Sequence, residues 1–121
     1  MSTEREMLEA AARAAGVEPA LIDQDGEIEG YDVNGDPIVL KGWNPRADDG
    51  DAFRLAAALR IGVEHNLPGD KHPWVCASFD PADCSQVCDF IEDVPDESQR
   101  ADRMRLAILR CAAAQAPKEG V

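Results

Sequence analysis

The N-terminal part of the chain has an apolar pattern with the period of a helix. Thr3 and Glu6 form a capping box, a pair of side chains that satisfies free amides of the first helical turn. Gly16 suits the end of the helix, and Pro19 opposes its continuation. Between them, apolar residues recur every three or four positions, at Met7, Leu8, Ala11, Ala12 and Ala15. The pattern predicts a helix between Thr3 and Gly16.

Between residues 27 and 41 the apolar period changes to two, which is typical of strands. Asn34-Gly35 separates two runs of β-forming residues, and this dipeptide is the strongest short signal for a hairpin. Pro37 has no N–H to donate, so we expect it where the ladder needs no donor. The alternation is carried by Ile28, Tyr31, Val33, Ile38, Val39 and Leu40. The segment predicts a β-hairpin.

A second helical pattern follows the break at Trp43-Asn44-Pro45. The carboxylates of residues 48, 49 and 51 suit a helix N-terminus, because they accept from free amides and complement the helix dipole. We expect this helix to end just before Gly62. Trp43 is either a core anchor that holds the hairpin against this helix, which we favour, or an exposed contact for a partner. The apolar face consists of Ala52, Leu55, Ala56 and Leu59.

Three further segments favour strands. The first contains Ile61 and Val63, and the second runs from Trp74 to Phe79 after a turn at residues 67–70. Residues 80–93 are ambiguous: Val87, Phe90 and Ile91 fit a short helix, but Gln86 to Ile91 also fits a strand. We favour the strand.

A third helix closes the pattern. Asp96 and Gln99 have the spacing of a cap, and Pro117 ends the helix. Its apolar stripe consists of Met104, Ala107, Ile108, Cys111 and Ala112. The sequence therefore predicts a single acidic α+β domain over residues 1–121. In it, a small antiparallel sheet, made of the hairpin plus two or three further strands, is packed by three helices.

The charge balance narrows the classes of function. The chain has 121 residues, with 24 Asp and Glu against 12 Lys and Arg, so its formal net charge is -12. This excess argues against direct binding to nucleic acid, whose phosphates attract Lys and Arg, and against docking on an anionic membrane surface. No apolar run has the length of about 18 residues that a membrane span needs, and residues 1–6 lack the apolar region of a secretory signal. We expect a cytoplasmic protein.

Two stretches, residues 23–36 and 80–97, are acidic and contain neither Lys nor Arg. One interpretation is a solvated surface that keeps the protein soluble. The other is a negative surface that meets a positive surface on a partner. On that interpretation the candidate partner-binding residues are Asp23, Asp25, Glu27, Glu29, Asp32, Asp36, Asp80, Asp83, Asp89, Glu92 and Asp93.

Metal binding has limited support. Residues 32–36 begin like a calcium loop, but Pro37 stands where that loop needs glycine, and Trp43 stands where it needs glutamate. A candidate zinc set has the spacing His-x3-Cys-x7-Cys-x3-Cys, which is looser than paired Cys-x-x-Cys knuckles. It consists of His72, Cys76, Cys84 and Cys88. Reduced cysteines that pack as small apolar groups are the favoured interpretation, above all for Cys111, so we expect no cofactor.

Catalytic motifs are absent. The chain has neither the Gly-x-Ser-x-Gly pattern of a nucleophile elbow nor a glycine-rich phosphate loop. The only histidines, His65 and His72, are not adjacent to a recognisable nucleophile. We therefore expect a protein that is not an enzyme.

The segment Trp43-Asn44-Pro45-x-x-Asp48-Asp49-Gly50-Asp51-Ala52 resembles a signature of small uncharacterised phage and prophage proteins. The helix before Gly16 and the Arg- and Ala-rich helix at residues 103–113 are similar to helices of those proteins, so the resemblance covers about half of the chain. A weaker likeness is to phage domains described as an α–β–α sandwich. The resemblance implies a phage origin without an established enzyme activity, and it transfers no catalytic residue. Residues 64–97 have no counterpart in it.

These observations lead to one functional hypothesis and two alternatives. We expect a phage-encoded accessory protein that binds and inhibits or modulates a host protein, such as a nucleic-acid-binding CRISPR or restriction complex. Its acidic surface would meet the basic groove of that complex in a salt-sensitive association. The alternatives are a zinc-stabilised small domain, which would use the candidate zinc set, and a self-associating component of phage structure or morphogenesis. The sequence leaves the oligomeric state open.

Overall fold

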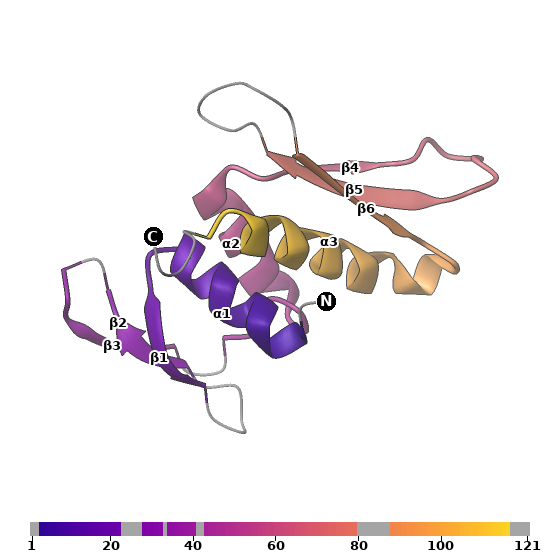
Figure 1. The fold of residues 1–121 in the computed structure, drawn as a ribbon. Coiled ribbons are helices and arrows are strands. Elements are labelled where there is room, and N and C mark those ends of the chain that lie inside the picture. Colours follow the sequence, from indigo (N-terminus) through magenta and orange to yellow (C-terminus); the bar gives the residue numbers. More distant parts are fainter. Residues whose placement is uncertain (1–2, 23–27, 33, 41–42, 80–87, 117–121) are drawn as a thin grey trace.

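The described residues form an α+β fold of three helices and two three-stranded antiparallel sheets, which confirms the predicted class (Figure 1). The computed structural model describes residues 3–22, 28–32, 34–40, 43–79 and 88–116. The helices are α1 (Glu4–Ala14), α2 (Asp49–Leu59) and α3 (Arg100–Ala114), and a 3-10 turn at Glu97–Gln99 precedes α3.

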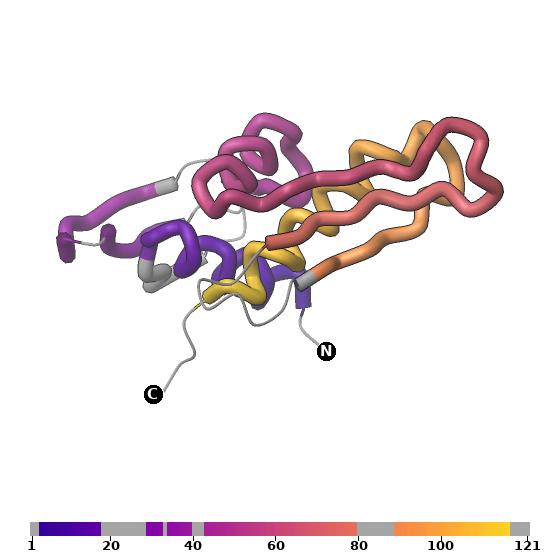
Figure 2. The backbone as a smooth tube through the Cα atoms, turned by 90° about the horizontal axis from the view of Figure 1, so that it is seen from above, coloured from indigo at the N-terminus to yellow at the C-terminus, as the bar shows by residue number. Residues whose placement is uncertain are grey.

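The strands divide between two sheets, where the sequence predicts one. The first sheet has the order β1-β2-β3 and the second the order β4-β5-β6. The two sheets lie at opposite ends of the molecule (Figures 1 and 2). Each sheet forms from strands that are consecutive along the chain, and α2 lies between the two sets in the sequence. The strands are β1 (Glu18–Ile22), β2 (Ile28–Tyr31), β3 (Pro37–Leu40), β4 (Gly62–His65), β5 (Trp74–Phe79) and β6 (Cys88–Asp93).

β1 is a strand that the apolar pattern of the sequence does not predict. Pro19 opposes a helix, but its fixed φ is compatible with extended backbone on an edge strand. β1 is an edge of the first sheet, and its pairing with β2 shifts register between Pro19 and Leu21. Pro19, which the sequence predicts only to oppose a helix, therefore lies within the strand that follows.

Both predicted caps of α1 are confirmed. The amide of Glu6 donates to Thr3 Oγ1 at 3.1 Å. Gly16 has a φ of 94°, in the left-handed region that glycine adopts without strain. The amide of Val17 donates to the carbonyl of Ala12 at 2.9 Å, which closes the helix in a Schellman motif.

α2 begins as predicted but ends differently. Asp48 Oδ2 accepts from the amide of Asp51 at 2.8 Å and so caps the helix. The left-handed residue at its end is Arg60, with a φ of 59°, and Gly62 instead lies in β4. A left-handed non-glycine residue costs about 1 kcal/mol. The guanidinium of Arg60 donates to the carbonyl of Ala57 at 2.8 Å, which helps to offset this cost.

The predicted hairpin is confirmed as β2 and β3. Tyr31 pairs with Pro37, so residues 32–36 form the connection, and Gly35 within it has a φ of 81°. Val33, which the alternation included, lies outside the described residues.

The strands of the second half agree with the sequence apart from their ends. β5 covers the predicted residues 74–79. The strand interpretation of the ambiguous segment is confirmed, since β6 runs from Cys88 to Asp93, two residues later than predicted. Asp96 caps the turn before α3 by accepting from the amide of Ser98 at 2.9 Å. Residues 80–87 and Pro117 lie outside the described residues.

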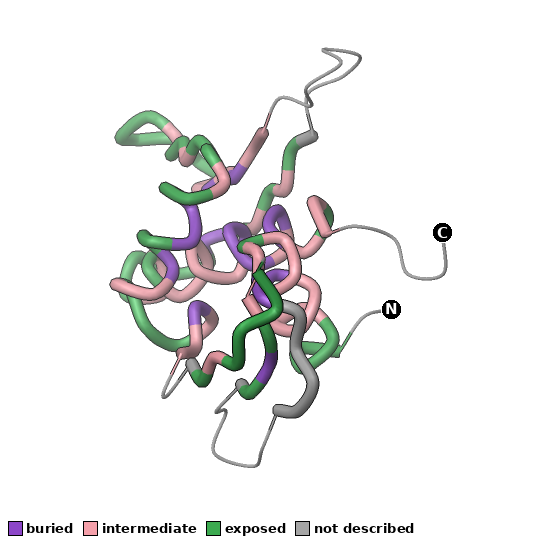
Figure 3. Tube along the Cα trace, turned by 90° about the vertical axis from the view of Figure 1, so that its left-hand side faces the viewer, coloured by how far each residue is buried: buried purple, intermediate pink, exposed green. Residues whose placement is uncertain are grey.

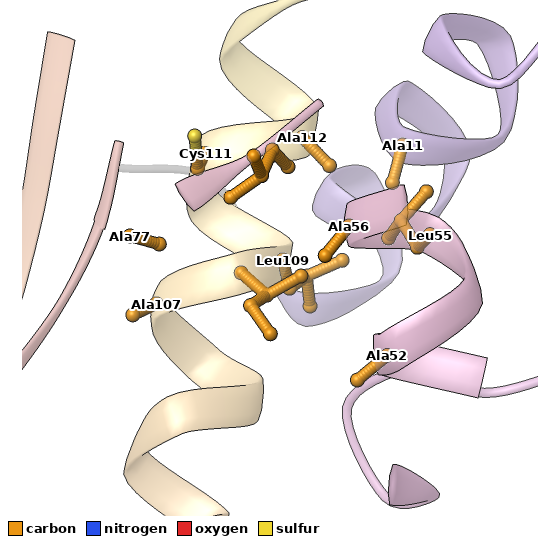
Figure 4. Close-up of a cluster of buried hydrophobic side chains, with 11 residues drawn as sticks. Ala11, Ala52, Leu55, Ala56, Ala77, Ala107, Leu109, Cys111 and Ala112 are labelled. Carbon is orange, nitrogen blue, oxygen red and sulfur yellow. The ribbon is translucent and has the colours of Figure 1, made fainter. Parts of the chain in front are cut away.

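The core forms where α3 meets α1, α2 and the second sheet (Figure 3). Ala107 faces Ala77 of β5, whereas the apolar residues of α2 lie on the opposite side of α3 (Figure 4). The larger of two core clusters contains Ala11, Ala52, Leu55, Ala56, Ile61, Ala77, Ala107, Ile108, Leu109, Cys111 and Ala112. α3 is therefore the central helix, and the predicted apolar stripe is its buried face.

A second, smaller core cluster lies beneath the first sheet. It consists of the buried residues Ala12 and Val17, with Ile38 of β3 packed against them. Trp43 is half-buried and contacts both clusters, in agreement with its favoured interpretation as a core anchor.

Candidate functional site

The second sheet has one face packed against the helices and one open face. Side chains alternate between the two faces of a strand. In β5, Val75 and Ala77 are fully buried, and α3 packs against this strand and against β6. Among the described residues, the helices gather on this side of the sheet only (Figure 1). The alternate positions of β5 belong to the opposite surface, which we call the open face.

The open face is hollowed. The hollow has a volume of about 490 Å³, and all three strands contribute to its lining. The register places Trp74 opposite Asp93, Cys76 opposite Ile91, and Ser78 opposite Asp89. The lining residues are Glu64, His72, Trp74, Cys76, Ser78, Asp89, Ile91 and Asp93.

The hollow combines carboxylates with apolar surface. Glu64, Asp89 and Asp93 are exposed, and none of the described residues that line the hollow is Lys or Arg. Ile91 is 59% exposed, although it lies at the centre of a strand. Acidic groups around apolar surface suit a ligand that is cationic and also partly apolar, because charge and buried apolar area then act together.

Cys76 in this hollow is a thiol at neutral pH. Burial raises its pKa, and the negative charges of Asp89 and Glu64 raise the pKa further, whereas a hydrogen bond with the Phe90 backbone lowers it. A nucleophilic cysteine needs the opposite environment, in which positive charge stabilises the thiolate. Cys76 therefore contributes a small, soft surface to the hollow.

Asp89 and Asp93 are the described members of the second acidic stretch that reach the open face. Glu92 lies between them in β6, but its carboxylate is mostly buried and pairs with Arg110 of α3. The guanidinium of Arg110 also lies over the Phe90 ring, 5.5 Å from its centroid. Glu92 thus fastens β6 to α3, a role that alternation along the strand explains.

The acidic residues of the hairpin belong to the other end of the molecule. Glu29 and Asp36 are exposed there. Asp32 holds the hairpin connection, since its Oδ1 accepts from the amides of Asn34 and Asp36 at 2.9 and 3.0 Å. The candidate residues that lie outside the described part of the chain are Asp23, Asp25, Glu27, Asp80 and Asp83.

The candidate zinc set is only partly visible. His72 and Cys76 line the same hollow. Cys84 lies outside the described residues, and of Cys88 only the backbone is described, in register with Phe79. Within the described ranges, no three His, Cys, Asp or Glu side chains are close enough together to hold a metal ion.

A second hollow, of about 550 Å³, lies between α1, α3 and β6. Its lining is mainly apolar and includes Met7, Ala10 and Phe90. Its two charged side chains already have partners, because Glu6 contacts Thr3 and Arg110 pairs with Glu92. This hollow therefore offers apolar surface without the free charges of the open face.

Sequence reasoning missed four residues of the open face: Glu64, Trp74, Ser78 and Ile91. The alternation in residues 74–79 separates Trp74, Cys76 and Ser78 from Val75, Ala77 and Phe79. That alternation was the available signal, and the small buried residues Val75 and Ala77 mark the side that packs closely against a helix. It does not indicate that the opposite side stays uncovered.

Comparisons of this chain with protein-family models, with curated proteins and with solved structures find no match. Among the described residues, the helices are too short or too polar to cross a membrane.

Proposed function

We propose that this protein is a non-catalytic binding protein that docks through the open face of its second sheet onto a positively charged surface of a partner protein. The observation that carries the proposal is the hollow itself. It combines the exposed carboxylates of Glu64, Asp89 and Asp93 with the exposed side chain of Ile91, and its described lining includes no Lys or Arg.

A protein partner fits this surface better than the other classes of ligand. Nucleic acid would bring phosphates towards three carboxylates on a chain with a net charge of -12. The raised pKa of Cys76 disfavours nucleophilic catalysis by this thiol, because the thiolate is the reactive form. A basic protein surface supplies both the cations and the apolar contacts that the hollow can bind.

The resemblance of residues 43–52 to phage proteins supplies the biological setting of this proposal. In that setting the partner is a nucleic-acid-binding defence complex of the host, such as a CRISPR or restriction complex, and the two proteins meet in the host cytoplasm. The basic groove of such a complex attracts phosphates and would attract this acidic surface in their place. Binding would then inhibit or modulate the complex.

The test compares two double variants that remove equal charge from the two sheets. D89N/D93N neutralises the open face, and E29Q/D36N neutralises exposed positions of the hairpin. The probe is octalysine, with binding followed by fluorescence anisotropy at low and high salt. Two rim charges contribute roughly 1 kcal/mol together, so we expect D89N/D93N to weaken binding about fivefold. E29Q/D36N should leave the affinity nearly unchanged.

Equal losses in the two variants would show that octalysine responds to net charge and not to the open face, and would overturn the proposal. No loss in either variant would overturn it as well. Circular dichroism of both variants checks that the fold is intact.

A further inference from the structure

We propose that the partner binds by strand addition: an extended basic segment pairs with the free edge of β6 and becomes the fourth strand of the second sheet. This inference rests on the proposed function, because it takes the occupant to be a basic protein segment. It adds the conformation of that segment, the edge on which it lies and the spacing of its charges.

β6 offers a suitable edge. It is the last strand in the order β4-β5-β6, so one side of its backbone has no neighbouring strand among the described residues. The amide of Val94 donates to the carbonyl of Pro73 across the sheet at 3.0 Å. The direction of main-chain hydrogen bonding alternates along an antiparallel strand. The main-chain groups of Asp89, Ile91 and Asp93 therefore point towards the free edge.

The hollow of about 550 Å³ lies where a fourth strand would pass. It is lined by Met7 and Ala10 of α1, by Phe90 of β6 and by Ala113 of α3. α3 packs beneath β5 and β6, and α1 packs against α3 and contributes to the same hollow as Phe90. A strand added about 4.8 Å beyond β6 would cover this apolar surface.

The side chains of β6 specify the sequence of the added strand. Directly opposite residues of paired strands contact each other, and opposite charges stabilise the pair. Cationic side chains opposite Asp89 and Asp93 lie four residues apart. The residues between them face Ile91 on the open side and Phe90 on the side of the hollow, so apolar residues fit there. A segment that runs antiparallel to β6 therefore reads basic-x-apolar-apolar-basic, from the residue opposite Asp93 to the residue opposite Asp89.

The other edges are less suited to strand addition. β1 contains Pro19 and β3 contains Pro37, and proline removes a donor and protects an exposed edge. β4 is the opposite edge of the second sheet, but it has four residues against six in β6. β6 contains no proline, lysine or arginine.

The test uses two peptides of identical composition and charge. Lys-Thr-Val-Val-Lys, with blocked ends, has the proposed spacing, and Lys-Lys-Thr-Val-Val does not. Two further peptides have the first sequence with alternate backbone amides N-methylated. One of them carries the methyl groups on the odd-numbered amides, and the other carries them on the even-numbered amides. Strand addition predicts that the first peptide binds best. It also predicts that one methylated version loses about tenfold in affinity while the other loses little, because one set of amides faces β6.

Equal affinity for all the peptides would overturn strand addition. If D89N/D93N still weakened binding of those peptides, the proposed function would survive. If neither peptide sequence nor these charges affected binding, both proposals would fail. The two failures are thus distinguishable.

A pair of variants tests the hollow without changing charge. Ala10→Phe places a ring where the added strand would pass, and Ala57→Phe places the same ring on the exposed side of α2 as the control. We expect A10F to weaken binding of Lys-Thr-Val-Val-Lys at least fivefold and A57F to leave it unchanged. Equal affinities of the two variants, with both folded, would contradict the assigned path of the strand.

Discussion

The two sheets of this protein have the same number of strands and the same antiparallel order, but they differ in how deeply their side chains are buried. The second sheet buries Val75 and Ala77 completely against α3. In the first sheet, the side chain of Ile38 is half-buried, and Tyr31 and Val39 are exposed. Strand pairing alone therefore does not make a sheet part of the core. The apolar residues on the covered face of the sheet do.

Removing buried side-chain volume should destabilise the protein more at the second sheet than at the first. Ile108 of α3 is almost fully buried in the larger cluster, so Ile108→Ala should lower the free energy of unfolding by about 2–5 kcal/mol. Ile38→Ala removes the same atoms from a half-buried position beneath the first sheet, and its loss should be less than half as large. Urea denaturation measures both. Equal losses would contradict the unequal roles of the two sheets.

An ion pair between Arg46 and Asp102 connects the first half of the molecule to α3. Arg46, which lies between β3 and α2, donates to Asp102 Oδ1 at 2.8 Å, and this hydrogen bond lowers the pKa of Asp102. Since the pKa of an unfolded aspartate is about 3.9, the link contributes stability above that pH and loses it as pH falls through the lower folded value.

Asp102→Asn should therefore be less stable than the wild type at pH 6, and the difference should shrink as the pH falls towards 2. The side chain of Asp102 is 42% exposed, so solvent screening limits the difference to below about 1 kcal/mol. Thermal unfolding as a function of pH measures it. A difference that is constant across this range would show that the carboxylate charge contributes nothing.

The open face also sets the reactivity of Cys76. Asp89 raises the pKa of Cys76, but burial raises it more. Asp89→Asn should therefore shift the pH profile of Cys76 alkylation to lower pH, although the pKa stays above that of an ordinary cysteine. Mass spectrometry of the peptide that contains Cys76 follows the reaction. E29Q, on the other sheet, is the control and should leave the profile unchanged.

The sequence predicts most of the local structure. Thr3, Gly16, Asp48 and Asp96 act at the predicted ends of elements because a cap needs only its neighbours along the chain. The division of the strands between two sheets was not predictable in this way, because it depends on where α3 packs. The end of α2 was not predictable either. A left-handed residue at a helix end is usually glycine, but here it is Arg60, whose side chain donates to the carbonyl of Ala57.

The candidate site was predicted only in part, because the sequence shows which residues are charged but not which face of a sheet stays uncovered. Charge alone pointed to Asp89, Glu92 and Asp93 together. The alternation of the strand separates them: Asp89 and Asp93 line the open face, whereas Glu92 pairs with Arg110 beneath the sheet. Trp74 and Ile91 carry no charge, so only the uncovered surface of the sheet reveals them.

The central claim is that the second sheet binds and the first does not. The most direct measurement is a nitrogen-15 NMR titration of the intact chain with Lys-Thr-Val-Val-Lys. The amide signals of Cys76, Asp89, Ile91 and Asp93 should shift with one common affinity, while those of Glu29 and Val39 stay in place. Shifts that centre on the first sheet, or that spread evenly over acidic residues of both sheets, would contradict the claim.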